Sequence, residues 1–440
     1  MLVTPTEAMT PSSKHLRPGV TRRDLLGWAM YDFANSGYAT VVLTAVFSAY
    51  FVGVVAADAA WATLAWTSVL AASHILVMIS LPAVSAWADR HAAKKRALAI
   101  STMGCVVCTA GLASVGAGDV VWAGVLIALS QLFFAYGESL AAAFLPELAP
   151  PEAMGRVSAW GWAWGYVGGM LTLGLSLAYV FWAQAQGQTA VDFVPITMLI
   201  TAAVFALASG VTFACLRERA VPQASRGTHA DAAAEGMLAR WRSTWAVLNS
   251  QPAMRWLLAC TVAYQAGVAV AIALAAIYAQ TVMGFETTET MLMVFVLNIA
   301  AAVGALVLGH GQDRFGHRRA LALTLVVWCV TCFWAAAATD KLSFWGAATL
   351  AGLSMGASQS CGRAMVGLLT PPAHLAVCFG AWTFAVRLAS VLGPLLYGLV
   401  TWFSGGNQRL ALACTAGLFV LGLLLLTQVR MPELPRVKRG

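Results

Sequence analysis

The chain has 440 residues, of which 60% are hydrophobic and only 10% carry a charge. Because a soluble globular domain has about 25% charged residues, a water-soluble fold of this size could not cover its surface. The composition therefore excludes a soluble fold and predicts a protein that crosses a membrane several times. The formal net charge of +8 fits cytoplasmic loops rich in Lys and Arg, and no nucleic-acid-binding pattern is present.

The chain begins with a polar stretch, residues 1–27, which we expect to be a cytoplasmic tail. The first apolar run, residues 28–55, is much longer than the about 7–15 residues of a signal-peptide core, and further apolar runs follow it. We therefore expect a membrane span here rather than a secretory signal.

Counting 28–55, the chain has twelve apolar segments, each long enough to cross roughly 30 Å of hydrocarbon, which takes about 20 residues. In the first half of the chain we place spans at 28–55, 64–87, 97–115, 120–145, 157–182 and 194–216. In the second half we place them at 256–282, 291–310, 320–338, 342–369, 375–403 and 410–429. The pattern predicts an all-α membrane protein of two pseudo-symmetric six-helix bundles, at 28–216 and 256–429, with a cytoplasmic linker at 217–255 and a cytoplasmic tail at 430–440.

The basic residues are distributed unevenly between the two sides of this predicted topology. With the N-terminus inside the cell, 22 of the 26 Lys and Arg residues fall in the tails and the cytoplasmic loops. Only Lys341 and Arg409 fall on the other side, while Arg363 and Arg387 fall within spans. Since cytoplasmic loops collect Lys and Arg, both termini are predicted to be cytoplasmic.

The linker at 217–255 contains two kinds of sequence. Its first part, 221–228, holds Pro, Ser and Gly and is typical of a connection without regular structure. Its second part places apolar residues on one helical face beside two arginines: Leu238, Trp241, Trp245, Leu248, Arg240 and Arg242. This spacing predicts a helix in the membrane interface, which either latches the two halves together or rests on lipid headgroups as a tether.

Two short polar stretches, one in each half, repeat the same residues. Asp89 and Arg90 follow one long apolar run, and Asp313 and Arg314 follow another, at an offset of 224 residues in both cases. Each stretch continues into a tight reversal and a basic cluster that cannot enter lipid. Since 224 is just over half of 440, the sequence indicates a duplicated membrane protein.

These stretches resemble the loop signature of the major facilitator superfamily, Gly-x-x-x-Asp-Arg-x-Gly-x-Lys/Arg-Lys/Arg, found between spans 2 and 3 and between spans 8 and 9. The second copy has both glycines, Gly309 and Gly316, whereas the first has Ser85 and Ala92 in their places. An alanine at a reversal that favours positive φ costs about 1 kcal/mol. The resemblance implies a transporter whose two loops gate its conformational cycle.

A narrower resemblance covers nearly the whole chain. It lies in the run Trp28-Ala-Met-Tyr-Asp-Phe-Ala-Asn-Ser36 and at 144–149, 155–158, 161–169 and 393–394. These look like the branch of the superfamily that includes vacuolar amino-acid effluxers of fungi and many bacterial proteins. The chain departs from that branch at 377–380 and around 359–363. The resemblance implies amino-acid export by a monomer in a bacterial inner membrane, with protons as the candidate coupling ion and with no cofactor or metal.

Four charged side chains lie within predicted spans, where each costs about 2.5–3.5 kcal/mol on insertion scales and is a functional candidate. Glu138 in span 4 and Arg363 in span 10 occupy matching positions at an offset of 225. In the superfamily, spans 1, 4, 7 and 10 line the central cavity, so the resemblance implies that these two face each other. We expect the pair either to gate transport and carry a proton, or to fix helix packing.

The other two charged residues are Asp32 in span 1 and Arg387 in span 11. Asp32 and Asn35 share one helix face, which suits a polar contact with substrate, an inner gate or a helix cap. Arg387 is expected to bind an anionic group, to partner Glu138 or to bind a backbone carbonyl. Gln265 gives span 7 a similar polar start.

An acid and an arginine in one cavity suit a zwitterion, because arginine can hold a carboxylate by two hydrogen bonds and an acid can hold an ammonium group. We therefore predict a secondary active transporter of a small molecule, with binding residues Asp32, Asn35, Glu138, Gln265, Arg363 and Arg387. The alternatives are a proton-driven exporter of hydrophobic compounds and a non-transporting receptor or assembly factor. An enzyme is not expected, because no set of nucleophile, base and oxyanion donors is recognisable.

Two pairs of cysteines, Cys105 with Cys108 and Cys329 with Cys332, have Cys-x-x-Cys spacing and are again 224 residues apart. A metal or redox site is one interpretation of this spacing. Each pair lies inside an apolar run without clustered His or acidic residues, however. We therefore interpret these cysteines as small buried hydrophobic residues.

Overall fold

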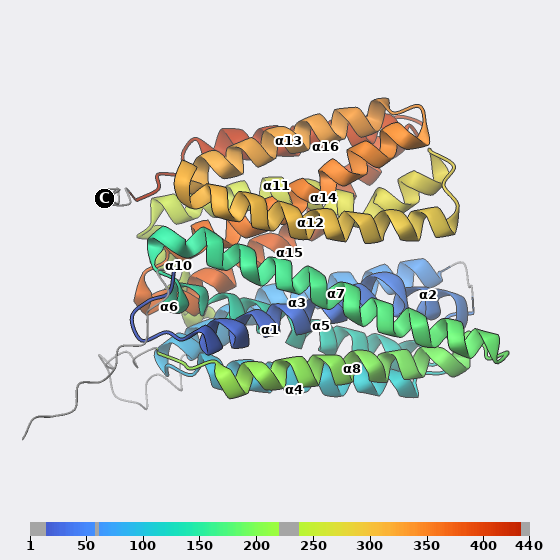
Figure 1. The fold of residues 1–440 in the computed structure, drawn as a ribbon, viewed down its shortest axis with the longest axis horizontal. Coiled ribbons are helices and arrows are strands. Elements are labelled where there is room, and N and C mark those ends of the chain that lie inside the picture. Colours follow the sequence, from blue (N-terminus) through green and yellow to red (C-terminus); the bar gives the residue numbers. More distant parts are fainter. Residues whose placement is uncertain (1–14, 58–60, 220–236, 433–440) are drawn as a thin grey trace, which may run out of the picture.

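The computed structural model describes residues 15–57, 61–219 and 237–432. Figure 1 shows two layers of long helices, one built from the first half of the chain and the other from the second half. The predicted tails at 1–27 and 430–440 and the predicted linker at 217–255 lie partly outside the described residues.

The first half forms six long helical segments. The first segment begins with α1 (Arg22–Tyr38) and continues through π-helical turns at Ala39–Ala45 and Phe51–Val55, with α2 (Phe47–Tyr50) between them. The short helix α6 (Leu145–Leu148) lies between the fourth and fifth segments. The remaining long helices are α3 (Ala62–Arg90), α4 (Lys94–Gly111), α5 (Val120–Ala142), α7 (Met154–Ala185) and α8 (Ala190–Cys215).

The second half repeats this arrangement after the linker. Its long helices are α11 (Pro252–Thr281), α12 (Thr287–Phe315), α13 (His317–Ala337), α14 (Lys341–Leu369), α15 (Leu375–Phe403) and α16 (Gln408–Leu426).

Within the described residues, eleven helical segments are long and apolar enough to cross a membrane. α14 is the twelfth long helix, with 29 residues, but it carries Ser354, Ser358, Ser360 and Arg363. These four side chains are buried against neighbouring helices. The polarity of α14 is therefore internal, as expected for polar groups in a membrane protein. The structure confirms the predicted all-α fold of twelve long helices.

The two halves meet along two seams. In the first half, α1 packs against α7 and α8. In the second half, α11 packs in the same way against α15 and α16. Between the halves, α3 packs against α15 and α7 packs against α12. We call the α3/α15 contact the first seam and the α7/α12 contact the second seam. Figure 1 shows α7 and α12 side by side at the boundary where the two layers meet.

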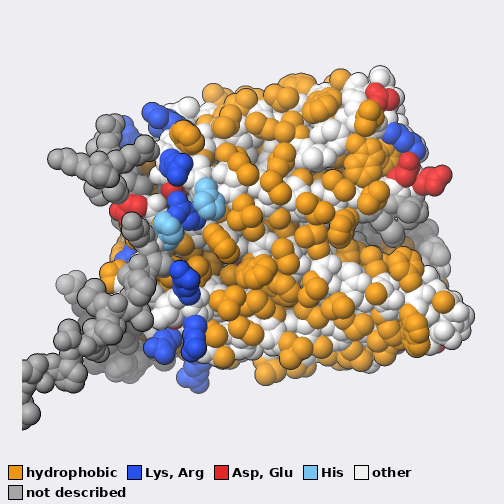
Figure 2. Space-filling view, viewed as in Figure 1, with side chains coloured by type: hydrophobic (Ala, Val, Ile, Leu, Met, Phe, Trp, Pro, Cys, Tyr) orange, Lys and Arg blue, Asp and Glu red, His pale blue; other side chains and the backbone are white. Residues whose placement is uncertain are grey.

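The two ends of the molecule differ in charge. Lys95, Arg156 and Arg318 lie in the first turns of α4, α7 and α13, and Figure 2 shows Lys and Arg gathered at one end, on the left. We call this the basic end. At the opposite end, Asp192 and Glu289 lie in the first turns of α8 and α12. Hydrophobic side chains cover the surface between the ends, as a bilayer requires.

The linker contains the predicted helix, α10 (Met237–Asn249). α10 contacts α3 of the first half and α11 of the second half. Leu248 is 7% exposed and Trp245 is 60% exposed. Of the two residues placed on the apolar face, Leu248 therefore packs on the bundle whereas Trp245 remains exposed.

The two repeated loops share the same backbone handedness. The φ angle is +47° at Ala92 and +94° at Gly316. Both values lie in the left-handed region that glycine adopts freely and alanine does not. The strain of about 1 kcal/mol expected at Ala92 is therefore built into the first loop.

Candidate functional site

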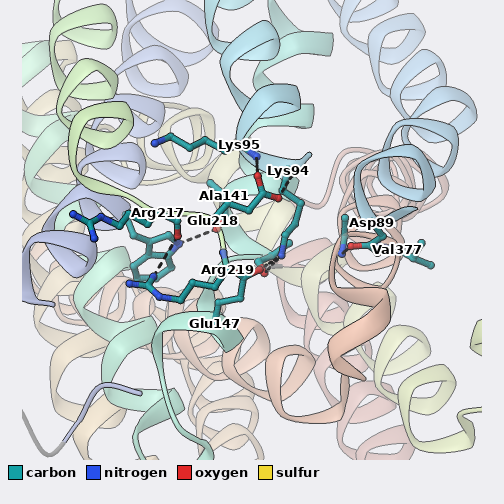
Figure 3. A network of polar contacts seen from close by, with 12 residues as sticks. Asp89, Lys94, Lys95, Ala141, Glu147, Arg217, Glu218, Arg219 and Val377 are labelled. Carbon is teal, nitrogen blue, oxygen red and sulfur yellow. Dashed lines mark hydrogen bonds and ion pairs between the residues drawn. The ribbon is translucent and has the colours of Figure 1, made fainter. Parts of the chain in front are cut away.

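The first seam is closed at the basic end by Asp89. Its two carboxylate oxygens accept hydrogen bonds from the backbone N–H groups of Ala376 and Val377, both at 2.9 Å, at the start of α15. The first turn of a helix carries N–H groups without intrahelical partners and a partial positive charge. A carboxylate there typically contributes about 0.5–2 kcal/mol. We call this contact the first lock, and Figure 3 shows Asp89 beside Val377.

The second seam is closed in the same way by Asp313. Its carboxylate oxygens accept hydrogen bonds from the N–H groups of Gly155 at 2.9 Å and Arg156 at 3.0 Å, at the start of α7. We call this contact the second lock. The duplication relates the two locks, because Asp89 and Asp313 are 224 residues apart and their partners Gly155 and Ala376 are 221 residues apart.

At one matching position of the repeat, each seam has a glycine facing a side chain, and this glycine lies on opposite sides of the two seams. In the second seam, Gly309 of α12 faces the Cβ atom of Ala159 on α7. In the first seam, Gly380 of α15 faces the hydroxyl of Ser85 on α3. A Cβ atom added to either glycine would overlap the facing side chain. The glycine missing from the first loop is therefore replaced by one on the partner helix.

Among the predicted gating residues, the two acids make hydrogen bonds that cross the seams. Arg314 is exposed beside its acid, and Arg90 is half-buried beside its own. Gly316 ends α12 at the turn that follows the second lock. The role of these residues in gating stays a prediction.

The start of the linker is bound to the basic end of the first half. The backbone N–H groups of Lys94 and Lys95 donate to the Glu218 carboxylate at 2.7 and 3.0 Å, which caps α4. The Lys94 ammonium pairs with Glu147, which also accepts a hydrogen bond from the N–H of Arg219 at 3.0 Å. Figure 3 shows this network. Burial raises the pKa of the Glu218 carboxyl, while the two N–H donors and the positive charge of Lys94 act in the opposite direction and favour its ionised form.

The expectation that Glu138 and Arg363 face each other is wrong, whereas the predicted alternative that Arg387 partners Glu138 is observed. Arg363 donates from Nη1 to Asp32 Oδ2 at 2.7 Å, and Glu138 pairs with Arg387 instead. Glu138 and Arg363 do match in the repeat, but Glu138 on α5 meets Arg387 on α15, while Arg363 on α14 lies against α7 and reaches Asp32 on α1. Each side chain therefore meets a different neighbour. Both acids belong to the first half and both arginines to the second, so each ion pair ties the halves together.

Arg363 is enclosed by the protein. Its Nη2 atom donates to the backbone oxygen of Ser158 at 2.7 Å, and its Nε atom donates to the hydroxyl of Ser158 at 3.3 Å. Its guanidinium carbon lies 4.8 Å from the ring centre of Trp28 and 5.2 Å from that of Trp162. A planar guanidinium suits such stacking. With its donors bound to Asp32 and Ser158, Arg363 holds the halves together.

The ion pair of Glu138 and Arg387 is more open. The two side chains are 28% and 10% exposed, respectively. The guanidinium carbon of Arg387 lies 5.6 Å from the ring centre of Phe134, and no residue in the described part of the chain accepts a hydrogen bond from its Nε atom. The Nε donor of Arg387 is therefore available to a further acceptor, whereas the Nε donor of Arg363 already binds Ser158.

The last two predicted binding residues lie on α1 and α11. Gln265 donates from Nε2 to the Oε1 atom of Gln359 on α14 at 2.6 Å. Asn35 is 7% exposed, and its Oδ1 atom has no hydrogen-bond partner within the residues that the structure describes. Substrate binding by these residues stays a prediction.

The sequence also matches a family of known proteins. A family model described as "Vacuole effluxer Atg22 like" matches residues 151–434, which is more than half of the chain. The chain belongs to this family. It is a membrane transporter of the major facilitator type and not an enzyme.

Relatives of this Atg22-like transporter agree with that assignment. It is 26% identical over 413 residues to YxiO, an uncharacterised MFS-type transporter of Bacillus subtilis (strain 168), covering 91% of this chain and 94% of the relative. It is also 26% identical over 140 residues to a tetracenomycin C resistance and export protein of Streptomyces glaucescens, covering 31% of this chain and 26% of that protein.

Solved structures show the same fold. The human organic anion transporter MFSD10 superposes with a TM-score of 0.71 at 17% identity, covering 92% of this chain and 99% of that one. The proton:xylose symporter XylE gives a TM-score of 0.71 at 14% identity, covering 93% and 96%. At these identities the likeness establishes the fold alone.

Sequence reasoning missed several residues of the Atg22-like transporter that lie beside Glu138. A cavity of about 30 Å³ is lined there by Trp162, Gln359, Trp382 and Thr383 from α7, α14 and α15. The sequence did contain one signal for them, the tryptophans Trp162 and Trp382 within apolar helices. The N–H group of a buried tryptophan needs a hydrogen-bond partner.

A larger groove lies between α11 and α15, away from the ion pairs. Its volume is about 520 Å³, and its lining includes Leu274, Pro394, Tyr397 and Trp402. The lining contains no charged residue within the described chain. The groove therefore lacks the ion pairs that connect the two halves.

Proposed function

We propose that this transporter exports amino acids by alternating access. The observation that carries the proposal is that two ion pairs cross between the halves, each with its acid in the first half and its arginine in the second. Opening a path between the halves separates both pairs, and an unpaired buried charge costs about 3–5 kcal/mol. A zwitterion offers one charge of each sign and can compensate the charges that separation leaves unpaired.

The basic end is proposed to face the cytoplasm of a bacterial cell. Lys and Arg collect in cytoplasmic loops of membrane proteins, and they gather at this end of the molecule. The first and second locks both close this end. The structure then corresponds to the state in which the path from the cytoplasm is shut.

The two ion pairs are proposed to have different roles. Asp32 is 18% exposed and its partner Arg363 is 3% exposed, which suits an inner gate. Glu138 is 28% exposed, which suits a residue that exchanges a proton or meets a substrate. Protonation of Glu138 would remove one charge of its pair and so make separation of the halves less costly.

Flux measurements in proteoliposomes test the proposal. The parent protein is expected to move labelled neutral amino acids saturably under an imposed pH gradient. Glu138→Gln is expected to reduce this flux at least about tenfold, because glutamine can neither exchange the proton nor hold an ammonium group. Arg363→Ala is expected to abolish the flux, because it leaves the Asp32 carboxylate unpaired. Glu289→Gln is the matched control, since its pair with Lys341 is exposed and contributes about 0–1 kcal/mol.

Two outcomes would contradict the proposal. One is that Glu138→Gln and Arg363→Ala move amino acids as fast as the parent. The other is that the parent, reconstituted and active on a different compound, moves no amino acid.

A substitution without any change of charge tests the inner gate. A Cβ atom at Gly161 would overlap Asp32, Arg363 and Trp28. Gly161→Ala is therefore expected to separate the pair, lower the free energy of unfolding by about 1–3 kcal/mol and reduce flux. Gly174→Ala is the control on the same helix, because its Cβ atom would meet open space. Equal thermal stability of the two variants would argue against a tightly built gate.

Export of hydrophobic compounds is the second candidate. It is favoured by the tryptophans beside Glu138 and by the similarity of 140 residues to a tetracenomycin C export protein. Competition between labelled leucine and a hydrophobic dye in the same vesicles separates the two functions. Our proposal predicts saturable flux of leucine, with only weak competition between leucine and the dye. The second candidate predicts flux of the dye without flux of leucine.

A further inference from the structure

A cavity of about 30 Å³ lies where α5, α7, α14 and α15 meet. It has room for a water-sized group and is far smaller than the about 300–1,000 Å³ of a complete ligand site. Its lining combines Glu138 with Trp162, Trp382 and Thr383. Arg387 reaches the same place through its ion pair with Glu138.

Four polar atoms in or beside this cavity have no hydrogen-bond partner among the described residues: three belong to its lining, and the fourth belongs to Arg387, which pairs with the lining residue Glu138. They are the indole nitrogens of Trp162 and Trp382, the hydroxyl of Thr383 and the Nε atom of Arg387. Trp382, Thr383 and Arg387 are 3%, 2% and 8% exposed, so bulk water does not satisfy them. Because a buried donor without a partner is destabilising, three of them in the lining and a fourth on the partner of Glu138 indicate that an acceptor binds there.

The chemistry of these four atoms defines the partner. The two indole nitrogens and the Arg387 Nε atom can only donate hydrogen bonds, and the Thr383 hydroxyl can also donate. The partner must therefore be an acceptor with several lone pairs. An ionised carboxylate accepts about four hydrogen bonds and pairs well with arginine. The nearby Gln359 does not change this balance, since its Oε1 atom already accepts from Gln265.

We propose that this cavity binds the carboxylate of the transported substrate, which displaces Glu138 as the partner of Arg387. The displaced Glu138 then holds the ammonium group of the same molecule. The inference rests on the proposed function and deepens it, because it assigns the substrate carboxylate to Arg387 rather than to the enclosed Arg363. The substrate class that fits is a small α-amino acid, whose two charged groups are separated by one carbon.

Binding of four related compounds to the purified parent protein tests this assignment. The probes are L-leucine, 4-methylpentanoate, L-leucinamide and 3-methylbutylamine, measured by isothermal titration calorimetry. Leucine and 4-methylpentanoate carry the carboxylate and are expected to bind. Leucinamide and the amine lack it, and their Kd is expected to be at least about tenfold higher. Equal or tighter binding of the two compounds without a carboxylate would overturn the proposal.

Two substitutions remove a donor and keep most of the side chain. Trp382→Phe and Thr383→Val are each expected to raise the Kd of leucine and of 4-methylpentanoate about tenfold. Neither is expected to lower the Tm, because each removes a buried donor that had no protein partner. A merely structural residue would give the opposite result, a lower Tm with unchanged Kd. Thr383→Val is sufficient for the test if Trp382→Phe does not fold.

Matched controls come from donors that already have partners. The indole nitrogen of Trp334 donates to Ser343 at 2.9 Å, and the Thr331 hydroxyl donates to a backbone oxygen at 2.8 Å. Trp334→Phe and Thr331→Val are expected to leave both Kd values unchanged.

The measurements separate this inference from the proposed function. If carboxylates bind and the two substitutions weaken them but no amino acid is transported, the carboxylate site stands and amino-acid export is wrong. If amino acids are transported but Trp382→Phe and Thr383→Val bind 4-methylpentanoate as the parent does, export stands and the carboxylate site is wrong.

Discussion

The first and second locks make the same contact in different surroundings. In each, a carboxylate at the end of one helix binds two backbone N–H groups at the start of a helix from the other half. The turn after the second lock has Gly316, whereas the turn after the first has Ala92 at a φ of +47°. We expect this strain of about 1 kcal/mol in the adjoining turn to weaken the first lock relative to the second. We therefore expect the first seam to open more readily.

The two seams also show what the duplication has kept. The close approach of the helices requires a glycine in each seam, which is Gly309 on α12 in one and Gly380 on α15 in the other. The glycine lies on a different one of the two facing helices in each seam, but the close approach between those helices is the same feature in both. The contact, more than the loop signature, is therefore what the two halves have in common.

Removing both locks should have the largest effect. In the double variant Asp89→Asn/Asp313→Asn, each seam loses a charged cap that contributes about 1–2 kcal/mol. The losses should add, since the locks lie in separate seams. The basic end should then open at least about 30-fold more often, because about 1.4 kcal/mol is a factor of ten.

Maleimide labelling of Cys378 measures this opening. Cys378 is 1% exposed in the first turn of α15, so it should react only when the first seam opens. Cys260 is the internal control, because it is buried within the second half and donates to a backbone oxygen of α16. The exposed Cys414 is replaced by alanine beforehand. Unchanged labelling of Cys378 in the double variant would show that the acids do not hold the basic end closed.

Exchanging the glycine between the two sides of the first seam should have the next largest effect. Gly380→Ala places a Cβ atom against Ser85, and we expect it to lower the free energy of unfolding by about 1–3 kcal/mol. Adding Ser85→Gly rebuilds the arrangement of the second seam and should restore most of that loss. Thermal unfolding of the single and double variants measures it. Failure of the second substitution to restore stability would mean that the seams are not equivalent in shape.

Exchanging the turn residues should have the smallest effect. Ala92→Gly relieves a positive φ and is expected to raise the free energy of unfolding by about 0.5–1 kcal/mol, whereas Gly316→Ala should lower it by about 1 kcal/mol. Denaturant unfolding of the purified variants gives both values. Changes of the same sign in the two variants would contradict the difference in strain between the loops.

Much of the fold could be predicted from the sequence, because its signals are local. Apolar runs of sufficient length mark the spans, and the polar loops between them carry Asp89, Asp313 and the basic residues in a repeated pattern. The strain at Ala92 was also predictable from the comparison of the two loops. These features depend on single residues and their neighbours in the chain.

The pairing of the buried charges could be predicted only in part: Glu138 was one of three partners expected for Arg387, and the pairing of Asp32 with Arg363 was not foreseen. Glu138 and Arg363 match in the repeat, which led to the expectation that they face each other. The structure pairs them with Arg387 and Asp32 instead, because partner choice depends on which helices cross at that depth. The donors at the cavity, such as Trp382, come together only when α5, α7, α14 and α15 meet.

The distance between the two halves at the basic end tests the central claim most directly. Spin labels at Glu152 and Arg314 report on the second seam, and labels at His91 and Pro372 report on the first; all four residues are exposed. Alternating access predicts mainly short distances in the parent and a second, longer population in the variant Asp89→Asn/Asp313→Asn. A single distance distribution that neither the double substitution nor added amino acid changes would contradict it.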